Sequence, residues 1–228
     1  IDMAHAMKPD ALPPWIEIRV VEEDVFEPGR DYFDIGAREK LFDTPCSIAR
    51  IYRATASRRK MVVSAEASRD LDGKPLTYRW VVLRGDDKSV TVNPLNESGS
   101  IAQLSIPYAP RRPIREGDQI ESNRTDIGVF VHNGHYHSPP AFVTCFTLDN
   151  EDRVYDSAGR IQQVTYHGES DPGHYVDPVI DLPKSWTDEY HYDEAGRSIG
   201  WSRMRGEAKE EFTPEGALVT ERDERGRP

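Results

Sequence analysis

Between residues 60 and 148, short segments of alternating apolar and polar residues are separated by turn-forming residues. Alternation with a period of two indicates strands that bury one face, and Gly, Asn and Asp favour the turns that end them. The predicted strands are 60–67, 76–83, 89–92, 101–106, 126–132 and 141–148. Many short strands without intervening helices predict a mainly β fold, namely an antiparallel β-sandwich of the immunoglobulin type.

The N-terminal part of the chain departs from this pattern. Residues 1–14 end in two prolines and are interpreted as a leader from upstream sequence, and a first strand is predicted at 15–21. Alternation then stops, and Thr44-Pro45 has the form of a helix N-cap followed by proline at the first helical position. We therefore expect a short helical insert at about 31–55, with helices near 34–42 and from Thr44 to about Arg53, inside a sandwich that spans 15–148.

Residues 149–228 repeat a short phrase. Tyr155-Asp156-Ser157-Ala158-Gly159-Arg160 returns as Tyr192-Asp193-Glu194-Ala195-Gly196-Arg197, with a looser copy at 212–218 and a related ending at 222–227. In each copy an aromatic residue and Asp end a strand, and Gly can take the left-handed conformation before the next strand. This pattern predicts a C-terminal β-meander of hairpins.

Residues 64–80 resemble part of a PKD-like domain. Their sequence is Ser64-Ala65-Glu66-Ala67-Ser68-Arg69-Asp70-Leu71-Asp72-Gly73-Lys74-Pro75-Leu76-Thr77-Tyr78-Arg79-Trp80. In that family a strand ends at an Asp-x-Asp-Gly turn, and the next strand carries a core tryptophan. The resemblance implies that Trp80 lies in the core of the sandwich with Tyr78 on the same side of its strand. Residues 126–131 resemble the penultimate strand of the same family.

The repeated C-terminal phrase resembles the RHS/YD repeats of secreted bacterial proteins, although a plain β-meander with convenient turns explains it equally well. Both families occur mainly outside the cytoplasm. The two resemblances therefore imply that this chain is part of a larger extracytoplasmic bacterial protein, which is secreted, periplasmic or on the cell surface.

The charge of the chain limits its partners. With 29 Lys and Arg against 40 Asp and Glu, the net charge is −11, which repels nucleic acid and anionic lipid. No apolar run reaches the roughly 20 residues that a membrane helix needs, so we expect neither nucleic-acid binding nor membrane insertion. Cys46 and Cys145 could form one disulfide, but two lone buried thiols are the favoured interpretation.

A group of three histidines is the first candidate site. If Asn133-Gly134 forms a two-residue hairpin turn, His132 faces His135 across the hairpin and His137 lies on the same side. Three imidazoles suit zinc, so these residues are a candidate zinc site. The alternative is a solvated hairpin face that holds no metal.

Two aspartates form the second candidate site. Asp70 and Asp72 offer clustered carboxylate oxygens, the ligands that calcium prefers. The alternative is that Asp70 caps the Asp72-Gly73 turn through hydrogen bonds to the backbone. Apart from this candidate calcium, no cofactor is expected.

Four aromatic residues of the tail, Trp186, Trp201, Tyr190 and Tyr192, form the third candidate site. If they are exposed together, they could stack on sugar rings, whereas burial would give them a packing role. No nucleophile elbow or other catalytic motif is present, so an enzyme is not expected. We therefore expect a non-catalytic structural or interaction module that contacts other domains of its parent protein. The alternatives are a carbohydrate-binding module, a module that binds another protein, and the accessory domain of a secreted enzyme with a metal at the histidine hairpin.

Overall fold

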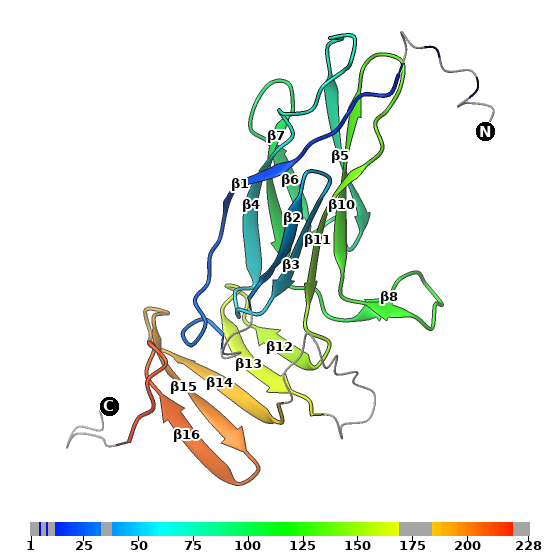
Figure 1. The fold of residues 1–228 in the computed structure, drawn as a ribbon. Coiled ribbons are helices and arrows are strands. Elements are labelled where there is room, and N and C mark those ends of the chain that lie inside the picture. Colours follow the sequence, from blue (N-terminus) through cyan, green and yellow to red (C-terminus); the bar gives the residue numbers. More distant parts are fainter. Residues whose placement is uncertain (1–4, 6–7, 9–11, 33–37, 169–183, 221–228) are drawn as a thin grey trace. The chain divides into compact units, whose positions relative to one another are not determined.

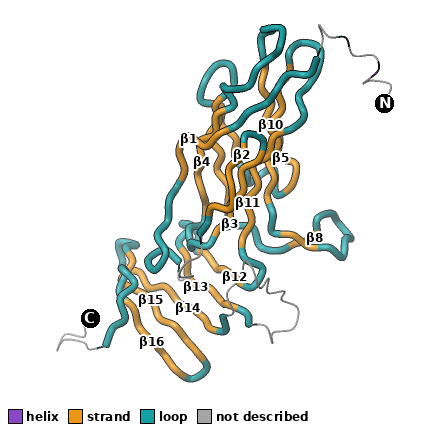
Figure 2. Tube along the Cα trace, in the orientation of Figure 1, coloured by secondary structure: helices purple, strands orange, loops and turns teal. Residues whose placement is uncertain are grey.

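The computed structural model describes residues 5, 8, 12–32, 38–168 and 184–220. The secondary-structure elements of these residues are strands, joined by turns and loops (Figure 2). The chain divides into two compact units. Unit 1 comprises Ile1–Val25, Arg38–Tyr52 and Arg58–Thr147, and unit 2 comprises Phe26–Ala37, Arg53–Ser57 and Leu148–Pro228.

Unit 1 contains a four-stranded antiparallel sheet in the order β1-β4-β7-β6 (Figure 1). Its strands are β1 (Arg19–Glu23), β4 (Arg58–Ser64), β7 (Ile101–Pro107) and β6 (Thr91–Pro94). β7 alternates strictly between half-buried and buried residues, which is the pattern expected of a strand with one face on a core.

The second sheet of unit 1 has five strands in the order β2-β3-β11-β10-β5. Its strands are β2 (Lys40–Thr44), β3 (Ser47–Tyr52), β11 (Ala141–Thr147), β10 (Thr125–His132) and β5 (Thr77–Arg84). All neighbours are antiparallel except β3 and β11, which run parallel. A small separate hairpin pairs β8 (Arg112–Pro113) with β9 (Glu121–Ser122).

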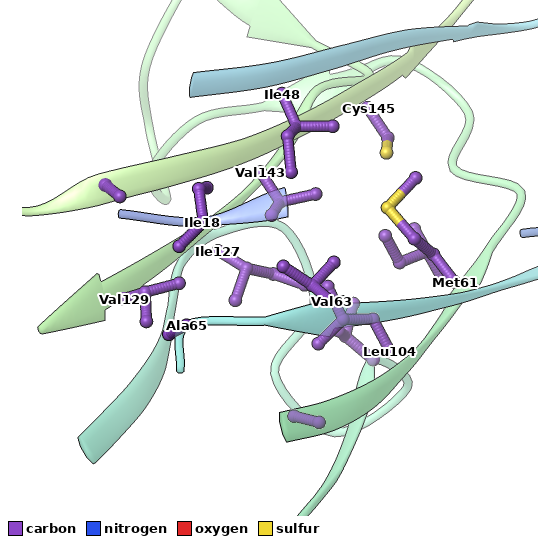
Figure 3. Close-up of a cluster of buried hydrophobic side chains, with 14 of the residues drawn as sticks. Ile18, Ile48, Met61, Val63, Ala65, Leu104, Ile127, Val129, Val143 and Cys145 are labelled. Atoms are coloured by element: carbon purple, nitrogen blue, oxygen red, sulfur yellow. The ribbon is translucent and has the colours of Figure 1, made fainter. Parts of the chain in front are cut away.

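The core of unit 1 lies between these two sheets, as the β-sandwich prediction requires. Buried side chains of both sheets point toward one another, among them Val63 and Leu104 from one sheet and Ile127 and Val143 from the other (Figure 3). Fully burying an aliphatic side chain of this kind contributes about 1.5–3 kcal/mol to stability. The predicted mainly β sandwich is confirmed.

Trp80 lies where the sequence places it, on the core side of β5. Its half-buried indole packs against the core together with Tyr78, and Trp80 Nε1 donates a hydrogen bond to the carbonyl oxygen of Gly99 at 2.8 Å. The polar edge of the indole is thus satisfied while its ring adds to the core.

The predicted helical insert is wrong. In the described residues 38–55 the chain forms the hairpin β2–β3, and the predicted helix near 34–42 lies partly outside the described residues. The Thr44 hydroxyl accepts a hydrogen bond from the Ser47 N–H at 2.9 Å, so the residue predicted as an N-cap instead closes the hairpin turn around Pro45. Ile48, Ile51 and Tyr52 are buried in a strand that is covered on both faces.

Unit 2 is built on a five-stranded antiparallel meander in the order β12-β13-β14-β15-β16. Its strands are β12 (Glu151–Tyr155), β13 (Ile161–Tyr166), β14 (Trp186–Tyr192), β15 (Ser198–Arg205) and β16 (Ala208–Phe212). This is the predicted C-terminal meander. The segment Arg53–Ser57 belongs to the same unit, because Arg153 donates hydrogen bonds to the carbonyl oxygens of Arg53 (3.0 Å) and Ala54 (2.8 Å).

The repeated phrase forms the same turn each time. Asp156 Oδ1 accepts the N–H of Arg160 at 2.9 Å, and Asp193 Oδ1 accepts the N–H of Arg197 at 2.8 Å. Both carboxylates also bind the Nε of the same arginine. The turn glycines are left-handed in all three described copies, with φ of 77° at 159, 76° at 196 and 85° at 216. The related ending at 222–227 lies outside the described residues.

Only part of the predicted leader, residues 5, 8 and 12–14, falls within the described residues. The carbonyl oxygen of Leu12 accepts a hydrogen bond from Asn133 Nδ2 at 2.9 Å, which ties this segment to the sandwich. Within the described part of the chain no helix has the length and apolar character needed to cross a membrane.

Candidate functional site: the outer face of the five-stranded sheet

The five-stranded sheet of unit 1 has apolar side chains on both faces. Val129, Val131 and Val143 point into the core, so their neighbours along β10 and β11 point outward. Polar side chains, among them Arg79, Asp126 and Thr144, point outward, and so do several aromatic and aliphatic side chains from four strands. We call the following set the outer face: Phe42, Val81, Leu83, Phe130 and Phe142.

Strand register brings these residues together. Val81 and Phe142 both pair with Gly128, from opposite sides. The side chains remain accessible: Phe42 is 46% exposed, Leu83 is 49% exposed and Phe142 is 37% exposed. The outer face is therefore an exposed apolar surface that crosses the sheet.

A bulge and a glycine shape this face. The register between β5 and β10 shifts so that Arg84 pairs with Asp126 and Val82 pairs with Ile127, which leaves Leu83 as the extra residue. The side chain of Leu83 lies over Gly128, where its Cδ1 is 2.6 Å from the position a Cβ would take, and Phe130 Cε2 is 3.1 Å from it. The missing side chain at Gly128 thus lets Leu83 and Phe130 lie close to the sheet.

A groove of about 350 Å³ lies on this part of the face. Aliphatic and aromatic groups of Val81, Leu83 and Phe130 form its floor, and Arg79 and His137 are polar residues of its lining. The His137 ring meets the Phe130 ring edge to face, with 6.5 Å between their centroids. The groove therefore combines an apolar surface with a cationic side chain.

The histidine hairpin differs from the predicted geometry. His132 pairs with His137, not with His135, and the rings of the pair are 4.5 Å apart. The N–H of Asn133 binds the carbonyl of Tyr136 at 3.3 Å, so the loop has four residues and His135 lies within it. No group of three His, Cys, Asp or Glu side chains in the described residues is placed to hold a metal ion.

Asp70 caps its turn, as the alternative interpretation proposed. Asp70 Oδ1 accepts the N–H groups of Asp72 (2.9 Å) and Lys74 (3.1 Å), and Oδ2 accepts Asn133 Nδ2 at 2.6 Å. The hydrogen bond from Asn133, followed by these backbone donors, lowers the pKa of Asp70 below its usual value. Asp72 points elsewhere and lies 3.4 Å from Lys74 Nζ. Three N–H donors therefore bind the Asp70 carboxylate.

The four aromatic side chains of the tail make ring, cation–π or hydrogen-bond contacts within unit 2. Trp201 is only 4% exposed and stacks on Phe212 with the ring centroids 3.8 Å apart. Trp186 is half-buried, with the Arg203 guanidinium 4.3 Å from its ring centroid. Tyr190 stacks on Trp201, and the Tyr192 hydroxyl donates to the carbonyl oxygen of Ile161 at 2.8 Å. The burial of Trp201 means that the four rings do not form an exposed planar row.

Buried ion pairs of unit 2 were missed by the sequence reasoning. Arg203 donates from Nε and Nη2 to the two carboxylate oxygens of Asp188 at 2.7 and 2.8 Å. Arg153 similarly pairs with Glu151, and both side chains are 1% exposed. Single-sequence patterns place charged residues on the solvent face of a strand, so nothing local indicated that these arginines lie inside.

The outer face was also missed, although the sequence carries a signal for it. Trp80 to Leu83 is a continuous apolar run, which is typical of a strand with two apolar faces. The alternation along 76–83 was instead interpreted as a strand with one buried face.

The cysteines are free, as predicted. Cys145 is buried in the core of the sandwich, but the prediction of a buried thiol is wrong for Cys46, which is exposed. Burial raises the pKa of the Cys145 thiol to about 12, because the thiolate loses its solvation. Cys145 is therefore a packing residue at neutral pH.

Comparison with known proteins leaves the family open. No protein-family model matches the chain, and no curated protein matches it. Among solved structures, a nucleoside hydrolase-related hypothetical protein from Saccharophagus degradans, described as associated with carbohydrate metabolism, aligns with a TM-score of 0.32 and 15% identity. The alignment covers 64% of this chain and 28% of that chain. A likeness of this size carries no inference about the fold or activity of this chain.

Proposed function

We propose that this chain is a non-catalytic interaction module of a larger extracytoplasmic bacterial protein, and that its outer face docks against other domains of that protein. The observation that carries the proposal is the exposed apolar surface formed by Leu83, Phe130, Phe142 and their neighbours. Soluble domains seldom leave contiguous apolar side chains facing water unless a partner covers them. Burial of these side chains on docking releases water from apolar surface and favours association.

The charged groups that the structure brings together hold segments of the fold in place, which supports a structural rather than a catalytic role for them. Arg50 is 3% exposed and binds Glu23 and Asp43 with N–O distances of 2.7 Å each, so it joins β1, β2 and β3. Asp70 joins its own turn to the loop that contains Asn133. In each case a carboxylate accepts hydrogen bonds that hold segments of the fold together. The extracytoplasmic location rests on the resemblance to PKD-like domains and YD repeats.

Hydroxyl-radical footprinting of the complete parent protein and of this chain tests the proposal. Phe130, Phe142 and Leu83 should be oxidised more slowly in the parent, because a docked domain covers them. Trp15 (59% exposed) and Leu71 (70% exposed) lie off the outer face and serve as internal controls. Equal oxidation of Phe142 in the two samples would show that no domain of the parent covers the face.

A pair of substitutions in the parent sharpens the test. Leu83→Glu places a charge on the outer face and should restore oxidation of Phe142 to the rate found in this chain. Leu71→Glu is the matched control and should leave the protection of Phe142 unchanged. If the two variants behave alike, the protection does not arise from docking at the outer face.

A further inference from the structure

The groove on the outer face has a chemistry that selects a particular kind of partner. We propose that it binds an extended, acidic peptide segment in which an acidic residue and an apolar residue are separated by one position. The acidic residue pairs with Arg79, and the apolar side chain lies against Val81 and Leu83. This inference rests on the proposed function and names the partner of the same surface.

Arg79 supplies the charge. Its side chain is exposed and, among the described residues, has neither an ion pair nor a hydrogen bond. The neighbouring arginines differ, because Arg84 lies 3.7 Å from Asp126 and Arg124 lies 2.6 Å from the same carboxylate. In a chain whose net charge is −11, an unpaired cation beside an apolar groove is complementary to a carboxylate.

The floor of the groove selects an apolar side chain over a sugar. The side chains of Val81, Leu83 and Phe130 offer no hydrogen-bonding groups, and Ser138 Oγ already accepts the N–H of Val131 at 3.0 Å. Hydroxyl groups of a sugar ring placed on this floor would lose their bonds to water without replacement. An aliphatic or aromatic side chain gains from the same burial.

Strand β5, which contains Arg79, determines the spacing of the acidic and apolar residues in the peptide. β5 is at the edge of its sheet, and in the described chain it pairs with β10 alone. A free edge accepts an added strand through its backbone N–H and C=O groups. Arg79 and Val81 are two positions apart on the outer face, so an added strand places its own residues i and i+2 beside them. The partner motif is therefore acidic-x-apolar or, for the opposite strand direction, apolar-x-acidic.

Binding of short peptides to the full 228-residue chain tests this inference. The probes are end-capped heptapeptides of threonine in which positions three and five are Glu and Leu, in both orders. Titration followed by NMR should shift the methyl signals of Val81 and Leu83 in a saturable way. Replacing Glu by Lys in the peptide should abolish these shifts, because the lysine repels Arg79.

Matched variants distinguish the effect of a charge at the groove from the effect of the net charge of the chain on peptide binding. Arg79→Glu should weaken peptide binding about tenfold, since it puts like charges together. Arg19→Glu makes the same change at an exposed residue of β1 in the opposite sheet and should alter binding less than about twofold. Leu83→Asn should also weaken binding, whereas Leu71→Asn in an exposed turn should not.

Three results would overturn the inference. They are the absence of shifts at Val81 and Leu83, an equal effect of Arg79→Glu and Arg19→Glu, and shifts produced by oligogalacturonate but by none of the peptides. In any of these cases protection of Phe142 in the parent protein would still support docking at the outer face. The failure of the peptide inference is thus distinguishable from failure of the proposed function.

Discussion

Asp70 shows how much one residue depends on partners that are distant in the chain. The sequence indicates the turn at Asp72-Gly73, because Asp accepts backbone N–H groups two residues ahead. Gly73 is left-handed with φ of 70°, as such a turn requires. The shortest hydrogen bond to Asp70 comes from Asn133, which is 63 positions away. Asn133 is 4% exposed and in turn binds Leu12, so Asp70 contributes to holding three segments of unit 1 together.

Replacement of Asp70 by Ala should destabilise unit 1 in a pH-dependent way. The folded pKa of Asp70 is below its ordinary value of 3.8, so its ionised form is favoured by folding. Its contribution is therefore present above about pH 3.8 and is lost as the pH falls through the lower folded pKa. Urea unfolding should show a lower midpoint for Asp70→Ala than for the parent sequence near pH 7, and a smaller difference near pH 2.

The control for this prediction is Asp72→Ala. Asp72 is exposed, and its ion pair among the described residues is with Lys74, so its loss should change the midpoint much less at either pH. If Asp70→Ala and Asp72→Ala unfold at the same urea concentration near pH 7, the hydrogen bonds from Asn133 and the turn do not stabilise unit 1.

Between elements, β14 and β15 illustrate a contact that strand register creates. Asp188 pairs with Arg203 across the two strands, and their side chains are 0% and 7% exposed. The guanidinium lies 4.3 Å from the Trp186 ring centroid and 5.0 Å from that of Trp201. The cation is thus held by a carboxylate and by ring faces inside unit 2.

Asp188→Ala should lower the free energy of unfolding of unit 2 by about 3–5 kcal/mol, because it removes the buried carboxylate that binds the Arg203 guanidinium through two hydrogen bonds. Tryptophan fluorescence during denaturation measures the effect, since Trp201 and Trp186 lie beside the pair. The double variant Asp188→Leu, Arg203→Met removes both charges and should recover most of the loss. A double variant as unstable as Asp188→Ala would show that packing, and not the unpaired charge, is responsible.

At the scale of the whole molecule, the two units are interleaved along the chain. Unit 2 takes in Arg53–Ser57, which follows β3 of unit 1 directly in sequence. Arg153, 100 positions later, holds this segment by its bonds to two backbone carbonyl oxygens. A single cut between residues 147 and 149 would therefore separate a backbone segment from the arginine that binds it.

Arg153→Met should loosen the segment Arg53–Ser57. Its carbonyl oxygens would lose their charged donor, and the buried Glu151 would lose its ion pair with Arg153, at a cost of about 3–5 kcal/mol. Arg53 is 5% exposed, so trypsin should cleave after it slowly in the parent sequence and much faster in the variant. Arg160→Met, at a turn on the surface, is the control. Cleavage at equal rates in the two variants would contradict a role for Arg153 in holding this segment.

The sequence by itself determined the strands of 60–148 and the hairpins of the tail. These elements are local: alternation, the Asp72-Gly73 turn and the repeated Asp-x-x-Gly-Arg phrase act over a few residues. The resemblance to PKD-like domains placed Trp80 in the core, and a period of two placed Tyr78 on the same side of the strand. Along 40–52 the local pattern was ambiguous, since short apolar runs fit a helix or a buried strand, and pairing of β3 with β11 decided the outcome.

Only the tertiary structure decided which polar and apolar groups meet. Three contacts depend on strand register and on loop closure. They are the pairing of His132 with His137, the burial of Arg203 beside Asp188 and the hydrogen bond from Asn133 to Asp70. The groove likewise needs the bulge at Leu83 to face Gly128 on the neighbouring strand. Such contacts depend on the relative position of strands, which no short stretch of sequence encodes, and they determine where the candidate site lies.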